Sequence, residues 1–191
     1  MNQYLILSFA WIVYFLLHSL LAANSIKKYV SDNFTSVNKY YRFIYSAFAT
    51  LGLLAILAFS GHIPKKYFFE SVGIVRYVSL MLATFSVIIF RQAFRGYKLS
   101  YFIGLKTGDE EFVTTGILKH VRHPLYSATI LLVLGYFLFE PTMATLNSMI
   151  CIFLYLPIGI YLEEKKLIQQ YEGRYLQYKK EVPALIPKMF K

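Results

Sequence analysis

Charged residues and cysteine are both scarce in this sequence of 191 residues. Only 16% of the residues are charged, against about a quarter in typical soluble domains. The single cysteine, Cys151, lies inside an apolar run, so a disulfide framework and a thiolate metal site are excluded. Acidic residues are few as well, with 10 Asp and Glu against 20 Lys and Arg. The shortage of charge argues against a soluble domain and favours a membrane protein.

The positive charge has two possible explanations, and its position in the sequence separates them. A net charge of +10 is common in proteins that bind nucleic acid. Here the basic residues lie beside long apolar runs, where cytoplasmic loops of membrane proteins carry an excess of Lys and Arg. We therefore expect membrane lipids as partners and no nucleic acid.

Hydrophobic residues make up 57% of the sequence and gather into long runs. Runs of about 18 or more apolar residues are typical of membrane-spanning helices. The sequence predicts an all-α, polytopic membrane protein with a single integral membrane domain, 1–191. A three-span region, 1–98, comes first. The five predicted spans cover about residues 4–23, 43–60, 72–90, 125–139 and 143–162.

The last two spans are separated only by the six residues "EPTMAT". So short a joint predicts an antiparallel helical hairpin. The charged and aromatic tail after it is expected to form a helix and then a Pro-bounded extended end, "VPALIP".

Basic residues predict the orientation of the chain in the membrane. Cytoplasmic loops attract Lys and Arg, so the basic segments are expected inside the cell, with the N-terminus outside and the C-terminus in the cytoplasm. Lys65, Lys66 and Arg76 fall on the other side and argue mildly against this orientation. The small size and short loops suggest a bacterial inner membrane. The residues expected inside are Lys27, Lys28, Lys39, Arg42, Arg91, Arg95, Lys98, Lys106, Lys119, Arg122, Lys165, Lys166, Arg174, Lys179 and Lys180.

A cluster of cations and imidazoles, "KHVRHPLY", precedes the fourth predicted span. Pro124 suits the first turn of a helix, where its missing N–H costs nothing. The N–H groups and the helix dipole at such an end favour an anion, and Arg122 and His123 would flank it. In the alternative interpretation, Lys119, His120 and Arg122 only reach to lipid phosphates.

Two acidic residues, Glu163 and Glu164, directly follow the fifth predicted span. The antiparallel hairpin places them at the same membrane depth as the His-Pro sequence. Acidic residues at a membrane boundary are costly and mark either a site or a buried ion pair. The alternative to a site is a salt bridge with Arg122, or with Lys165 and Lys166.

The two clusters together resemble a known family. "TGILKHVRHPLY", the apolar hairpin, "EE" and "YLQYKKEVPALIP" are similar to the isoprenylcysteine carboxyl methyltransferase family, which includes bacterial membrane methyltransferases and related phospholipid methyltransferases. The resemblance covers about residues 112–187. The early "HSLLAANSIKKY" also resembles bacterial members that methylate small thiols. The resemblance implies S-adenosylmethionine as methyl donor, bound on the cytosolic side between hairpin and tail. Residues 99–191 would then form a methyltransferase core with the cofactor pocket.

The resemblance also implies roles for individual residues, and it implies no metal. Glu163 and Arg122 are expected to be the catalytic residues. We leave the general base open between His120, His123 and Glu163. The residues expected to bind the cofactor are Glu111, Phe112, Val113, Leu118, Arg122, His123, Pro124, Tyr126, Glu163 and Glu164.

Two positions depart from the family pattern. Relatives often have an aromatic residue where Leu118 stands, so this chain lacks that ring for stacking on the cofactor. Prenylcysteine-specific members carry an arginine where this chain has Gly159, so a carboxylate-bearing substrate loses its cationic partner. We therefore expect methyl transfer to a small or lipophilic thiol, amine or carboxylate. The alternatives are an NADPH-dependent enzyme of the sterol-reductase type and a non-catalytic lipid-binding membrane protein.

The remaining aromatic and imidazole side chains have structural interpretations. Tyr171, Tyr175 and Tyr178 recur at near-helical spacing, which is typical of packing or interface anchors. His18 is expected to make a buried polar contact. His62 lies in an outer loop and is given no role.

Overall fold

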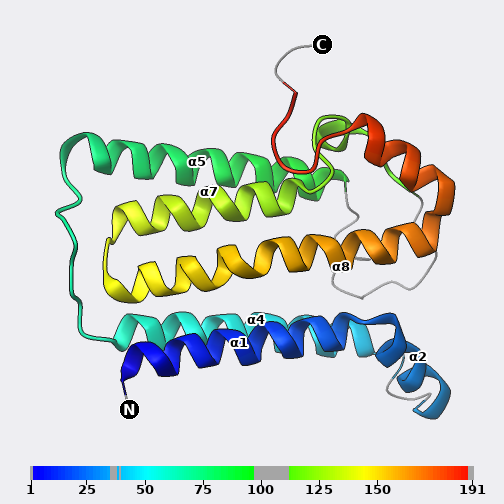
Figure 1. Cartoon of the computed structure of the whole chain (residues 1–191), viewed down its shortest axis with the longest axis horizontal. Coiled ribbons are helices and arrows are strands. Elements are labelled where there is room, and N and C mark those ends of the chain that lie inside the picture. Colours follow the sequence, from blue (N-terminus) through cyan, green and yellow to red (C-terminus); the bar gives the residue numbers. More distant parts are fainter. Residues whose placement is uncertain (1, 35–37, 39, 97–111, 189–191) are drawn as a thin grey trace.

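The computed structural model describes residues 2–34, 38, 40–96 and 112–188, and all regular secondary structure in these ranges is helical (Figure 1). The only strand-like pairing among them is an isolated bridge between Tyr67 and Thr142. The expected all-α fold is therefore confirmed. The helices are α1 (Gln3–Ala22), α2 (Asn24–Asn33), α4 (Tyr41–His62), α5 (Gly73–Gly96), the short 3₁₀ helix η1 (Gly116–Lys119), α7 (Pro124–Phe139) and α8 (Met143–Glu181).

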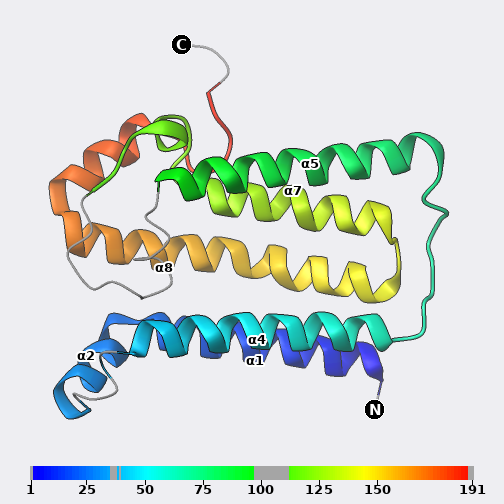
Figure 2. The same cartoon turned by 180° about the vertical axis from the view of Figure 1, so that it is seen from behind.

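Five long helices lie side by side in three layers. Both views show α8 between a pair made of α5 and α7 and a pair made of α1 and α4 (Figures 1 and 2). Successive long helices run in opposite directions, so the chain crosses the bundle five times. The N-terminus and the C-terminal tail consequently lie at opposite ends of the bundle.

The bundle has the length and composition of a membrane domain. α1, α4, α5 and α8 are long and apolar enough to cross a membrane. α7 has 16 residues, or about 24 Å of helix, which is shorter than a hydrocarbon core of about 30 Å. Large apolar side chains face outward, as Leu154 does at 70% exposure. The protein is therefore an integral membrane protein, and the fourth predicted span, 125–139, is a shorter helix within the same bundle.

Close contacts hold the helices together, both within a layer and between layers. Ser86 on α5 donates a hydrogen bond to the carbonyl of Ala128 on α7, at 2.8 Å. The indole of Trp11 on α1 donates to Ser148 on α8, at 3.0 Å. Such interhelical hydrogen bonds and close backbone packing stabilise helix bundles in lipid, where burial of apolar surface contributes little.

The last part of α8 does not continue straight. Glu172 has a positive φ of 46° with ψ of −125°, which interrupts the helix at this residue. Figure 1 shows the red end of α8 folding back toward η1. Lys179 hydrogen-bonds Glu164 although 15 residues separate them, which is about 22 Å along a straight helix. The reversal at Glu172 therefore brings the end of α8 back over its own membrane boundary.

Candidate active site

The buried carboxylate of Glu164 lies at the centre of the site. Its Oε1 accepts from Arg122 Nη2 at 2.7 Å and from Arg122 Nε at 3.1 Å. His123 Nε2 lies 3.1 Å from the same oxygen, and Lys179 Nζ donates to Oε2 at 2.5 Å. One carboxylate therefore joins α8, the start of α7 and the folded-back end of α8.

The charge of Glu164 follows from these contacts. Its position lies beyond the apolar part of α8, which ends at Leu162. Burial by itself raises the pKa of the carboxyl, but hydrogen bonds from Lys179, His123 and Arg122 outweigh it and bring the pKa to about 2. Glu164 is thus an ionised anchor whose accepting oxygens are already engaged.

The guanidinium of Arg122 is also fully engaged. Besides its two bonds to Glu164, Nη1 donates to the carbonyl of Lys179 at 3.0 Å and to the carbonyl of Val182. A guanidinium donates through a fixed planar fork, so these bonds set its orientation. Arg122 therefore connects the start of α7 to the end of α8.

The extended tail closes over the start of α7. The backbone N–H of Arg122 donates to Pro183 at 2.9 Å, and that of His123 donates to Ala184 at 3.0 Å. The hydroxyl of Ser127 donates to the carbonyl of Leu185 at 2.6 Å. These bonds explain why the segment "VPAL" is extended, because its carbonyls satisfy N–H groups that precede the helix.

Glu163 has a different environment from its neighbour. Its side chain is 42% exposed, whereas that of Glu164 is 9% exposed. Glu163 Oε2 lies 3.8 Å from His123 Nδ1, and the carboxylate interacts electrostatically with the hydroxyl of Tyr126. The buried imidazole of His123 therefore lies between both glutamates, and Glu163 keeps accessible oxygen atoms.

An aromatic cluster lies beside this network. The ring of Phe112 contacts Tyr171, Tyr175 and Tyr178 at centroid distances of 4.9, 6.0 and 5.5 Å. The hydroxyl of Tyr178 donates to the carbonyl of buried Leu118, at 2.6 Å.

Tyr175 has a buried hydroxyl in this cluster. The residue is 1% exposed, and its oxygen meets no hydrogen-bond partner of acceptable geometry within the described ranges. Burial raises the pKa of Tyr175, so the hydroxyl stays neutral and can donate a hydrogen bond. An orphaned donor is a natural contact for a polar ligand atom.

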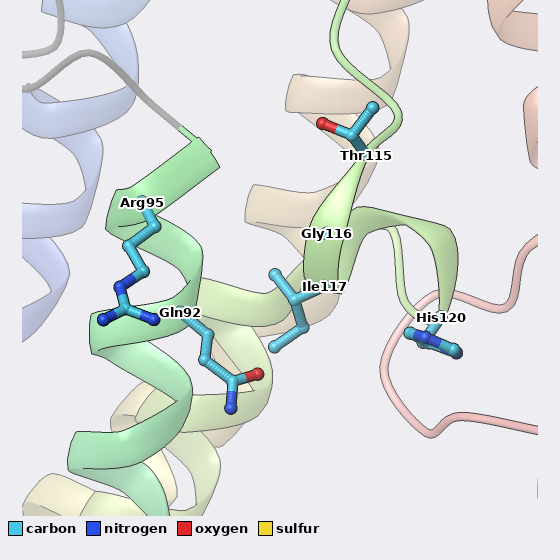
Figure 3. A pocket seen from close by; sticks show the side chains of 6 residues that line it. All are labelled: Gln92, Arg95, Thr115, Gly116, Ile117 and His120. Carbon is cyan, nitrogen blue, oxygen red and sulfur yellow. The ribbon is translucent and has the colours of Figure 1, made fainter.

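An open cleft lies on the other side of η1. It has a volume of about 480 Å³ and is lined by Gln92 and Arg95 on α5, the segment Thr115–Gly116–Ile117, and His120 (Figure 3). Leu118 is buried toward the aromatic cluster, whereas His120 is exposed at the cleft. The volume lies in the range of small-molecule sites, but the cleft shares none of its lining residues with the Glu164 network.

The structure brings most of the residues singled out from the sequence to one place. Arg122, His123, Tyr126, Glu163 and Glu164 form the network, with Pro124 buried at the first position of α7. Phe112 and Leu118 lie in the aromatic cluster, Val113 is exposed, and Glu111 lies outside the described residues. In the described ranges, no three His, Cys, Asp or Glu side chains are grouped as a metal site requires.

Two residues of this region were not predicted to belong to a site, since Lys179 was expected only as a cytoplasmic cation and Tyr175 only as a packing or interface anchor. Lys179 and Tyr175 follow the reversal at Glu172, and a straight helix would carry both far from the membrane boundary. The only local signal was Gly173, directly after Glu172, because glycine in a helix interior lowers helix stability.

Gly159 lies where α7 and α8 approach closely. A Cβ at this position would lie 3.1 Å from the hydroxyl of Tyr126 and 3.4 Å from the ring of Tyr155. The glycine therefore leaves room for both tyrosines, and a larger side chain here would meet the hydroxyl of Tyr126.

Comparisons with known proteins agree with this architecture. Over 117 residues the chain is 29% identical to methanethiol S-methyltransferase 2 of Bradyrhizobium diazoefficiens, an alignment that covers 58% of this chain. The same alignment spans 40% of the length of that relative. The model of the NnrU protein family matches residues 6–186. Because this match covers nearly all the chain, including every long helix, the protein belongs to the NnrU protein family.

Proposed function

We propose that this protein is an integral membrane methyltransferase that transfers a methyl group from S-adenosylmethionine to a small or lipophilic acceptor. The observation that carries the proposal is the position of His123 between Glu164 and Glu163. One glutamate fixes the imidazole and the arginine, and the other keeps accessible oxygen atoms at the same place. A lipid-anchored scaffold has no need of a carboxylate held in this way.

Similarity supports the class of reaction. The relative from Bradyrhizobium is named as a methanethiol S-methyltransferase, and "RHPLY" with "EE" resembles the isoprenylcysteine carboxyl methyltransferase family. For this chain we propose the same general reaction, with a thiol foremost among the acceptors.

The chemistry of the site fits the proposed donor. S-adenosylmethionine supplies a methyl group already activated on a sulfonium, so the protein needs no metal and no covalent nucleophile. We assign the accessible carboxylate of Glu163 to the donor's ammonium group, because opposite charges at a partly buried site attract strongly. We assign the hydroxyl of Tyr175, which has no hydrogen-bond partner among the described residues, to the donor's polar part, and the ring of Phe112 to its aromatic part.

The chain's own residues would act by orientation and exclusion of water. Holding two reactants in line can lower a barrier by about 7–11 kcal/mol. We assign Glu163 to direct contact with the donor, with His123 beside it. Arg122 was expected to be catalytic. Its four hydrogen bonds favour a positioning role, in which it holds Glu164 and the tail.

The bundle suggests how the two substrates arrive. We propose that the N-terminus lies outside and the C-terminus in the cytoplasm of a bacterial inner membrane. The water-soluble donor then reaches the Glu164 network from the cytosol. A lipophilic acceptor enters between helices from the bilayer.

Equilibrium binding of labelled S-adenosylmethionine to the detergent-purified protein tests the proposal. We expect saturable binding that NADPH does not displace, weakened at least tenfold in Glu163→Gln because a charge-assisted contact of roughly 1.5–3 kcal/mol is lost. Glu181→Gln is the matched control, since Glu181 is exposed near the end of the same helix. Absence of saturable binding overturns the proposal, and displacement by NADPH favours a reductase.

Transfer of labelled methyl groups into thiols, lipids and quinones, followed by mass analysis, identifies the acceptor.

A further inference from the structure

A second group of polar side chains lies inside the bundle, and the proposed function does not use it. We call it the His18 cluster: His18 and Ser19 on α1, Tyr45 on α4 and Tyr155 on α8. His18 Nε2 lies 2.8 Å from the Tyr45 hydroxyl, and the Ser19 and Tyr155 hydroxyls are 2.8 Å apart. Ionisable side chains within membrane helices are costly and mark sites more often than packing.

The two ring nitrogens of His18 are bonded unequally. Nε2 makes a short hydrogen bond to Tyr45, whereas Nδ1 lies 3.5 Å from the Tyr155 hydroxyl, at the limit of hydrogen bonding. With its proton on Nε2, the imidazole donates to Tyr45, and the lone pair of Nδ1 is left with this one long contact. A ligand with a donor group can take that position.

The His18 cluster adjoins the methyltransferase site through Gly159. The rings of Tyr155 and Tyr126 both approach this glycine, and Tyr126 interacts electrostatically with Glu163. A chain of contacts thus runs from Glu163 through Tyr126 and Tyr155 to His18. Gly159 therefore lies beside one tyrosine of each group, Tyr126 and Tyr155.

The surroundings of the cluster are aromatic. Phe15 stacks on Tyr155 at a centroid distance of 4.0 Å, and Tyr14 lies 5.9 Å from the ring of His18. The charged group facing the cluster is Lys166 on α8, whose Nζ donates to the carbonyl of Ala22 and interacts electrostatically with His18. Aromatic rings favour contact with sulfur and apolar groups.

We propose that the His18 cluster is the acceptor site, that it binds a small neutral thiol, and that Nδ1 of His18 takes the thiol proton. This inference rests on the proposed function, because it supplies the second substrate of the same reaction. The S–H proton passes to Nδ1, and the acceptor sulfur forms a bond to the methyl carbon. The bond between that carbon and the donor's sulfonium breaks, and its electron pair stays on the donor sulfur, which becomes a neutral thioether.

The chemistry of the cluster selects a thiol over the other expected acceptors. A small thiol is neutral near pH 7, and it becomes a strong nucleophile when a neighbouring imidazole takes its proton. An alkylamine, with an ordinary pKa of about 10.4, is a cation near pH 7 and would be repelled by Lys166. A carboxylate acceptor needs no base to remove a proton. It would also lack its cationic partner, because this chain has Gly159 where prenylcysteine-specific relatives have an arginine.

His18→Asn tests the role of the imidazole, with His62→Asn as the matched control. Asparagine keeps a hydrogen-bonding group near Tyr45 but cannot accept a proton, and His62 is an exposed residue that contacts only the carbonyl of Ala58 in the described ranges. General base catalysis contributes about 100-fold or more, so we expect kcat for ethanethiol to fall by that factor in His18→Asn with donor affinity unchanged. Wild-type turnover in His18→Asn overturns the inference.

The pH profile separates proton transfer from a structural role. Besides His18, the groups that titrate around the cluster are Tyr14, Tyr45, Tyr155 and Lys166. We expect the wild-type rate to fall at low pH as the imidazole is protonated. In His18→Asn the rate should follow the fraction of the thiol that is ionised in solution. This fraction rises roughly tenfold per pH unit up to the ordinary thiol pKa. Parallel profiles for the two proteins contradict proton transfer to His18.

Direct binding keeps the inference testable without turnover. The single tryptophan, Trp11, stacks on Phe15 at 5.2 Å, and Phe15 stacks on Tyr155, so Trp11 fluorescence should report occupancy. We expect saturable changes with ethanethiol but not with ethylamine or propanoate. The fluorescence changes with ethanethiol should be weaker in Tyr155→Phe, because this substitution removes a single oxygen atom and preserves the stacking. Equal binding of the three probes, or no effect of Tyr155→Phe, overturns the site.

Separate measurements on the methyl donor and the acceptor distinguish failure of the proposed function from failure of the thiol site. A wild-type protein that binds ethanethiol at His18 but no S-adenosylmethionine overturns the proposed function and leaves the thiol site. A protein that binds the donor and methylates acceptors equally well in His18→Asn keeps the proposed function and loses the thiol site.

Discussion

Two adjacent glutamates on α8 have the same side chain but different environments. Glu164 points into the bundle and accepts hydrogen bonds from Arg122, His123 and Lys179. Glu163 is about 100° around the helix, and its side chain is 42% exposed beside the same imidazole. The first carboxylate holds the site together and the second is available to a ligand. Substitution of each should therefore affect different properties.

Glu164→Gln should lower stability strongly. The change leaves two cations beside a neutral amide at a position that is 7% exposed. Removing one partner of a buried ion pair costs about 3 kcal/mol or more. Unfolding by SDS in mixed micelles, followed by Trp11 fluorescence, measures the loss. Glu181→Gln should change the free energy of unfolding by less than about 0.5 kcal/mol, as exposed substitutions do. Equal effects of the two changes would refute the anchoring role.

The low pKa of Glu164 also predicts how stability depends on pH. Its pKa is about 2 in the folded protein against an ordinary value of 4.5. A carboxyl with a lowered pKa adds stability above its unfolded value and loses it as the pH falls toward its folded value. The Glu164 contribution should therefore be constant above about pH 5 and disappear between pH 4.5 and 2. The difference in unfolding free energy between wild type and Glu164→Gln should shrink over this window, and a constant difference would falsify the assignment.

At the level of helices, the sequence predicted what hydropathy can detect. The expected spans at 4–23 and 125–139 correspond to α1 (Gln3–Ala22) and α7 (Pro124–Phe139) within a residue. The resemblance noted over 112–187 is confirmed by a family match across 6–186. The polar helix α2 was missed, because its residues form no apolar run. The reversal at Glu172 was missed because long-range contacts, such as that of Lys179 with Glu164, decide it.

The contact between α5 and α7 depends on a small residue. A Cβ at Gly135 would lie 3.0 Å from the carbonyl oxygen of Ser79 and 3.2 Å from the backbone nitrogen of Ala83. Backbone cannot move aside as a flexible side chain can, so Gly135→Ala must separate the two helices. We expect a loss of about 1–3 kcal/mol in unfolding free energy, measured in the same mixed micelles.

Gly173→Ala on α8 is the control for this change, because no atom lies within 4 Å of its added Cβ. It should be neutral or slightly stabilising, since alanine favours a helix by up to about 1 kcal/mol over glycine. Similar losses at Gly135 and Gly173 would show that helix propensity, and not close packing, decides the outcome.

At the scale of the whole molecule, the two ends of the bundle differ in how they use charge. Arg76 packs over the ring of Phe139 at 3.6 Å and donates to the carbonyl of Phe139 at the end of α7. Lys65 pairs with Glu140 at 2.7 Å. These cations are thus engaged at the C-terminal end of α7, where the helix dipole favours positive charge. They are therefore compatible with the proposed orientation, in which this end lies outside and the end rich in Lys and Arg is cytoplasmic.

Cysteine labelling tests the resulting orientation. In a Cys151→Ser background, Glu70→Cys places a thiol on the exposed segment between α4 and α5, which is joined to the α7–α8 turn through Phe68 and Pro141. Lys180→Cys places one on the exposed end of α8. An impermeant maleimide should label position 70 in intact cells and position 180 only after permeabilisation, because three crossings, those of α5, α7 and α8, put these segments on opposite sides. The reverse pattern would place the Glu164 network outside, away from a cytosolic methyl donor, and would remove the basis for the proposed reaction.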